Sequence, residues 1–122
     1  MNATADGRCV STAPLDLETI RRTAQEVIAD GARIEQPDEI ATIITLLRGV
    51  LELLIPEVET LTGRHPREHV PAICARACLG ESRMRLRLGN GDTPAVRLST
   101  AQRLARSALA LADHYERLGE PS

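Results

Sequence analysis

Four metal-ligating side chains follow one another closely near the middle of the chain. His65, His69, Cys74 and Cys78 have the spacing H-x3-H-x4-C-x3-C, and two imidazoles with two thiols are a ligand set that binds zinc. On one unbroken helix the two pairs would lie roughly 180° apart, and only a fold-back at an intervening proline could bring them together. We therefore expect Cys74 in the core, Cys78 at its edge and both histidines in a solvated turn, with no metal and no other cofactor.

A second candidate is Glu81, which we expect near the middle of an apolar helix face. An ionised carboxylate is costly there unless it is paired. Arg85, four residues further on, is one candidate partner, and Arg48 on another helix is the second. One interpretation is a structural ion pair at the edge of a bundle. The other is a ligand pocket between helices, lined by Glu81, Cys74, Met84, Arg48 and Arg85.

Two leucines of the same segment point to an interface. On a helix Leu79 and Leu86 project roughly opposite the expected core stripe, which contains Val70, Ile73, Cys74, Ala77, Met84 and Leu88. A monomer would expose both leucines. With Cys78 nearby, they indicate a second buried face, either a homodimer interface or an extra helix contact.

The arginines allow two interpretations. Arg76, Arg83 and Arg87 share the predicted outer face of this helix, and Arg103 and Arg106 lie near the start of the next one. Either they form a solvated surface, or they bind an acidic partner, a phosphate group or DNA.

These residues belong to a predicted set of four helices. Hydrophobic periodicity places helices over about 16–29, 39–62, 70–88, and from 93–94 or from 99 to about 118. Residues 39–62 have the widest apolar stripe, so we expect this helix at the centre, covered on one side by the first helix and kinked near Pro56. The fold class is all-α, an antiparallel bundle of about four helices. Residues 1–14 read as a disordered tail containing Cys9, and residues 15–119 as one domain.

Composition excludes several classes of function. Phe and Trp are absent and Tyr115 is the one aromatic residue, so no platform exists for stacking bases. The net charge is −2, although all 15 basic residues are Arg, so nucleic-acid binding is not expected. No apolar run reaches the roughly 20 residues of a membrane span, and no signal pattern opens the chain. The expectation is a cytoplasmic protein that does not bind a membrane.

Three segments carry a resemblance to a known family: RGVLELLIPEVE at 48–59, PAICARACLGESRMRLRLGNGD at 71–92 and RLARSALALADHYERLG at 103–119. The chain is similar over about 46–119 to a family of small all-helical proteins of unknown function from high-G+C bacteria, sometimes labelled natural product biosynthesis protein. The resemblance implies an association with secondary metabolism and assigns no catalytic residue.

The expected function is a non-enzymatic helical interaction or accessory protein with a regulatory role. Its partner is a second copy of the chain or another protein. The alternative is a small-molecule-binding bundle with a pocket between helices near Glu81. A third hypothesis is a small enzyme that uses Glu81 or His69.

Overall fold

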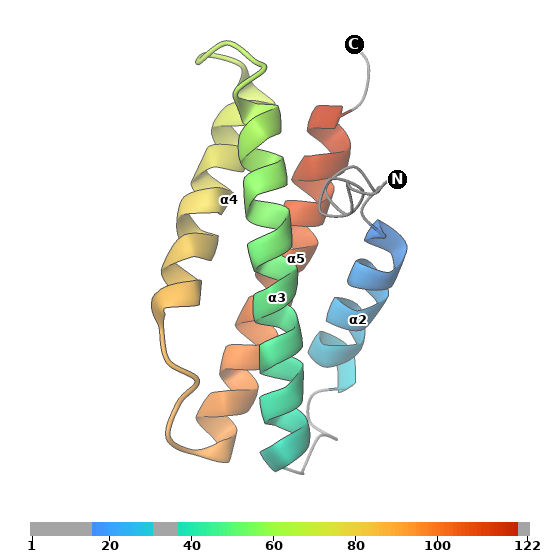
Figure 1. Ribbon diagram of the computed structural model, residues 1–122, viewed down its shortest axis with the longest axis vertical. Helices are drawn as coiled ribbons and strands as arrows, with labels where there is room; N and C mark the ends of the chain where they lie inside the picture. Colours follow the sequence, from blue (N-terminus) through green and yellow to red (C-terminus); the bar gives the residue numbers. More distant parts are fainter. Residues whose placement is uncertain (1–15, 31–36, 120–122) are drawn as a thin grey trace, which may run out of the picture.

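The computed structural model describes residues 16–30 and 37–119. These residues form four helices, α2 (Leu17–Asp30), α3 (Pro37–Thr62), α4 (Val70–Arg87) and α5 (Pro94–Gly119), and the described ranges contain no strand. Successive helices run in opposite directions, so α3 and α5 are parallel (Figure 1). The predicted all-α bundle is confirmed. The predicted tail, with Cys9, lies outside the described residues.

Polar side chains fix the helix starts at positions that the sequence indicates. Asp16 caps α2, because its carboxylate accepts hydrogen bonds from the backbone N–H of Thr19 at 3.1 Å and from the Thr19 hydroxyl at 2.7 Å. The hydroxyl bond is the main reason that the pKa of Asp16 lies below its ordinary value. The earlier of the two predicted starts for α5 is confirmed, since the Thr93 hydroxyl accepts a hydrogen bond from the N–H of Val96 at 3.2 Å.

Helix α3 supplies most of the large buried side chains. Its 26 residues form one helix that contains Pro56 in its interior, as expected, while the kink at Pro56 stays a prediction. The core is aliphatic. Its largest fully buried apolar side chains are Ile44, Leu47, Leu51, Leu54 and Val58 from α3, with Leu104 and Leu111 from α5.

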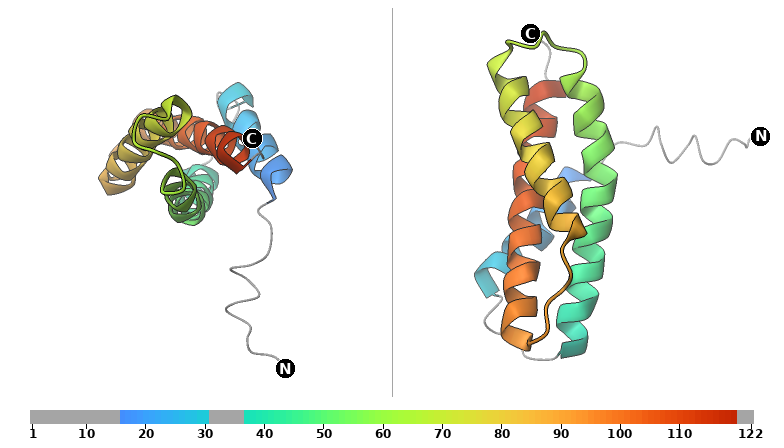
Figure 2. Two further views of the ribbon diagram at one scale, coloured as in Figure 1. Left: turned by 90° about the horizontal axis from the view of Figure 1, so that it is seen from above. Right: turned by 90° about the vertical axis from the view of Figure 1, so that its left-hand side faces the viewer.

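The last helix, α5, packs against all three other helices, whereas α3 packs mainly against α4 and α5. The prediction that the first helix covers α3 is therefore wrong, because α2 packs mainly on α5. Figure 2 shows α2 and α4 on opposite sides of α5. None of the helices in the described ranges is long and apolar enough to cross a membrane.

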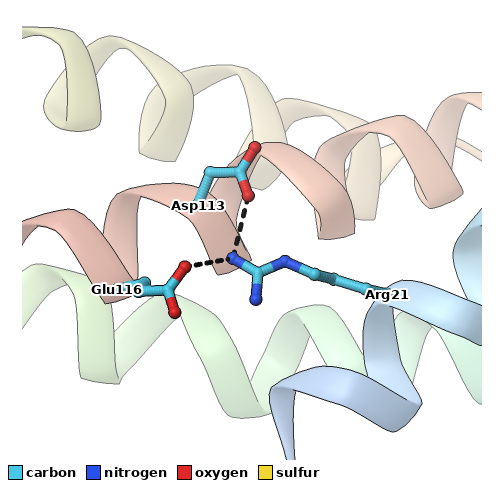
Figure 3. Close-up of polar contacts among 3 residues, drawn as sticks. All are labelled: Arg21, Asp113 and Glu116. Atoms are coloured by element: carbon cyan, nitrogen blue, oxygen red, sulfur yellow. Dashed lines mark hydrogen bonds and ion pairs between the residues drawn. The ribbon is translucent and has the colours of Figure 1, made fainter.

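A single arginine ties α2 to α5. Nη2 of Arg21 lies 2.9 Å from both Asp113 Oδ1 and Glu116 Oε1 (Figure 3). The hydrogen bond to Asp113 is the largest cause of a raised pKa at Arg21. Helix α2 has only 14 residues, and this polar clamp adds to its apolar contact, in which Ala24 and Val27 are buried.

Candidate functional site

The histidine and cysteine residues do not converge. The rings of His65 and His69 stack with their centroids 4.3 Å apart, in the turn before α4. Cys74 is exposed on α4 and Cys78 is half-buried, where burial raises the pKa of its thiol. Across residues 16–30 and 37–119, no three His, Cys, Asp or Glu side chains are placed to hold a metal ion. The expectation that Cys74 lies in the core is wrong.

Glu81 lies on the outer surface of the bundle rather than on a buried face. Of its two predicted partners, Arg85 is correct, because Nη2 of Arg85 is 3.7 Å from Oε1 of Glu81. The Glu81 carboxylate of this pair is exposed, and exposed ion pairs contribute little to the free energy of unfolding. Met84 and Cys74 share this outer surface. Glu81, Cys74 and Met84 therefore lie outside the space between helices where the pocket was expected.

Helix α4 is rotated relative to the prediction, so its two faces exchange roles. Leu79 is only 2% exposed, and Leu86 packs partly buried against the core. The inner face is otherwise made of small residues, Ala72, Ala75 and Ser82. Small side chains let neighbouring helices approach closely. Leu79, Leu86 and half-buried Cys78 thus hold α4 to its own bundle and do not form an exposed interface.

The stripe predicted as core instead faces outward. Its large residues Val70, Ile73, Met84 and Leu88 are about half exposed or more, and Val70 reaches 66%. Ala77 and Gly80 are exposed between them. Helix α4 lies at one edge of the bundle in Figure 1, and no other described helix covers this outer side. We call these six residues the α4 outer stripe.

Arg48 binds the end of α4 and not Glu81. Its guanidinium donates to the carbonyls of Leu86 at 3.0 Å and Leu88 at 2.7 Å. It also donates twice to Oδ1 of Asn90, at 3.2 and 2.8 Å. The last carbonyls of a helix lack partners within the helix and carry partial negative charge. Arg48 therefore closes the α4 end and fixes the loop that follows it.

Two other arginines of α4 bind the neighbouring helix α3 and are only partly exposed. Arg76 donates to the carbonyl of Thr62 at 3.0 Å, and Arg83 pairs with Glu59 at 2.6 Å. The prediction that Arg76 and Arg83 lie on an outer face is wrong, because that side of α4 packs on α3.

A hollow of about 370 Å³ lies beside the loop that connects α4 to α5. Its lining contains Arg85 from α4, Arg103 and Thr100 from α5, and apolar Leu88, Val96 and Leu104. Gly89, Gly91 and Asp92 of the loop complete it. Arg85 is the one residue of the predicted pocket that lines this hollow. The stop signal GNGD marks the loop in the sequence, but the loop residues alone do not reveal that a hollow forms there.

Together these features define a four-helix bundle with an exposed apolar stripe on its edge helix and a small hollow at the α4–α5 loop. A family model described as a family of unknown function (DUF6415) matches residues 18–120. The chain belongs to this family, which agrees with the resemblance to a family of unknown function. Neither the curated proteins nor the solved structures gave a match to the chain.

Proposed function

We propose that this protein is a non-enzymatic accessory protein that works as a homodimer, with the α4 outer stripe as the contact between the two copies. The observation that carries the proposal is the exposure of this stripe along a helix whose opposite face is already packed in the core. Exposed apolar patches of this kind, bordered by charged residues, mark protein interaction surfaces.

The order of residues in the stripe favours a second copy as the occupant. Residues 70, 73, 77, 80 and 84 follow alternating steps of three and four, the spacing of the contact positions in paired helices. If two α4 helices cross antiparallel with the two-fold axis between Ala77 and Gly80, Ile73 of one copy lies opposite Met84 of the other. Ala77 then lies opposite Gly80, so the helices can approach closely at the crossing point. The same stripe matches itself under a two-fold axis, as a symmetric dimer requires.

Three partly exposed arginines support a structural role for the charged residues of the bundle. Arg48, Arg76 and Arg85 each donate to backbone carbonyls of a neighbouring helix or loop. Their positions are thus explained by the fold. The regulatory role, the association with secondary metabolism and the cytoplasmic location that the sequence favours remain part of the proposal.

Light scattering after size exclusion tests the dimer. A contact formed by one helix from each copy is small, so we expect a dissociation constant in the micromolar range. The molar mass is therefore measured at protein concentrations from about 10 to 500 µM. Ile73→Glu should give a monomer. Leu53→Glu is the matched control, because Leu53 and Ile73 are both 48% exposed and Leu53 lies on α3. A native chain that stays monomeric over the whole range would refute the proposal.

Disulfide trapping tests the antiparallel register. In a background with all three cysteines replaced by serine, Ile73→Cys and Met84→Cys are purified separately and then mixed under oxidation. The mixture should give a disulfide-linked pair. Each variant alone should not, because the two copies of residue 73 would lie about 16 Å apart along the helix axes. Equal linkage of the separate variants would contradict this register.

A further inference from the structure

We propose that the hollow at the α4–α5 loop binds a small amphipathic carboxylate, with Arg103 as the group that recognises the carboxylate. This site shares Leu88 with the α4 outer stripe, but the proposal does not rest on the dimer. The hollow arises from a difference in helix length. Helix α4 has 18 residues, whereas α3 and α5 have 26 each. On the side of α5 that faces α4, about 12 Å of helix therefore lies beside the loop 88–93 instead of beside α4. Figure 2 shows this loop running along α5.

The loop is held in one conformation before any ligand binds. Arg48 of α3 fixes Leu88 and Asn90, and Nε of Arg97 donates to the carbonyl of Gly91 at 3.0 Å. Gly91 has φ +107°, a conformation that side chains disfavour, and a Cβ there would overlap Val96. A hollow built on such a fixed loop loses little ordering entropy when a ligand binds.

Charge in the hollow favours an anion. Arg85 and Arg103 line it with two positive charges against the single negative charge of Asp92, and Glu81, outside the lining, pairs with Arg85 at 3.7 Å. The Arg85 guanidinium is already engaged, since it donates at 2.8 Å to the carbonyl of Arg103 and at 2.7 Å to the hydroxyl of Ser107. The Arg103 guanidinium has no hydrogen-bond or ion-pair partner within the described part of the chain. Its planar donor fork matches a carboxylate in two parallel hydrogen bonds.

The remaining lining favours an apolar body on the ligand. Val96 and Leu88 both line the hollow and are each about half exposed, and Leu104 forms a buried part of its wall. A short hydrocarbon chain would cover this apolar surface while its carboxylate reaches Arg103. The volume of about 370 Å³ lies at the lower end of the range for small-molecule sites.

Calorimetric titration with hexanoate tests the proposal, with 1-hexanol and hexylamine as ligands of similar length that lack the carboxylate. Hexanoate should bind saturably and more tightly than either. Arg103→Gln should weaken it about tenfold or more, and Arg103→Lys should weaken it less. Arg106→Gln is the matched control, because Arg106 is an exposed arginine of α5 that does not line the hollow.

Leu88 belongs both to the hollow and to the α4 outer stripe, so each titration is repeated on Ile73→Glu. Hexanoate binding that needs Arg103, in either the native chain or Ile73→Glu, supports the proposal whatever the oligomeric state. Three results would overturn the proposal: no hexanoate binding to the native chain or to Ile73→Glu, equally tight binding of 1-hexanol, or unchanged hexanoate binding in Arg103→Gln. None of these results would affect the dimer proposal.

Discussion

The sharpest test of which face of α4 is buried is to truncate one side chain on each face separately. Leu79 is 2% exposed and Met84 is 60% exposed, although periodicity alone assigns them the opposite environments. Leu79→Ala removes buried methyl groups and leaves a cavity, which costs about 2–5 kcal/mol of unfolding free energy. Met84→Ala removes atoms that largely face solvent, so we expect a change within about 0.5 kcal/mol in the monomer.

Urea unfolding followed by circular dichroism measures both variants. For a domain of this size a loss of 3 kcal/mol should also lower Tm by about 10 °C. Ile73→Glu is used as the background, because dimerisation would add a concentration-dependent term to the stability of the native chain. In the native background, any loss caused by Met84→Ala should grow with protein concentration. A loss in Met84→Ala as large as that in Leu79→Ala in the monomeric background would refute the orientation of α4.

Four further substitutions test individual contacts. Ser82→Ala should raise the unfolding free energy by about 1 kcal/mol in urea titration, because the buried Ser82 hydroxyl has no hydrogen-bond partner within the described residues. Arg48→Gln should lower it by about 1–3 kcal/mol and speed amide exchange in the loop 88–93, since the bonds that close α4 are lost. Gly91→Ala should cost about 1–3 kcal/mol through its positive φ and the overlap with Val96, measured as a lower urea midpoint. Burial is the main cause that lowers the pKa of His114 below 6.5, so protonating this imidazole is less favourable in the folded state than in the unfolded state. The free energy of unfolding should therefore have its full value above that pH and decrease as the pH drops below it. His114→Gln should reduce this decrease in unfolding experiments from pH 7.5 to 5.5.

Helix positions were predictable because local signals decide them. Asp16 before α2, Pro37 with two acidic residues at the start of α3, and the Gly-rich stretch after α4 are each recognisable in the sequence. The wide apolar stripe of α3 also identified the main supplier of the core. Which helix contacts the other three could not be predicted in the same way. The many alanines of α5 permit close approach of other helices, but hydrophobic periodicity does not say how many neighbours approach.

The orientation of α4 was mispredicted for a specific physical reason. Amphipathic periodicity weighs large apolar residues, and Val70, Ile73, Met84 and Leu88 all lie on one face. The buried face is dominated by Ala72, Ala75 and Ser82, which score weakly as apolar but fit closely against a neighbouring helix. The hollow was missed because it depends on the length of α4 relative to α5 and on the loop geometry fixed by Arg48.

The mistaken prediction itself bears on function. A surface helix normally needs one apolar stripe, and packing of the face around Leu79 meets that need for α4. The second stripe is not required for the bundle to form, and it leaves apolar area in water at a cost of roughly 25 cal/mol per Å². Association that covers the stripe recovers this free energy. Helix α4 thus has two apolar faces: small residues fill the inner one, which packs within the chain, and large residues fill the outer one, which supports the proposed contact with a second copy.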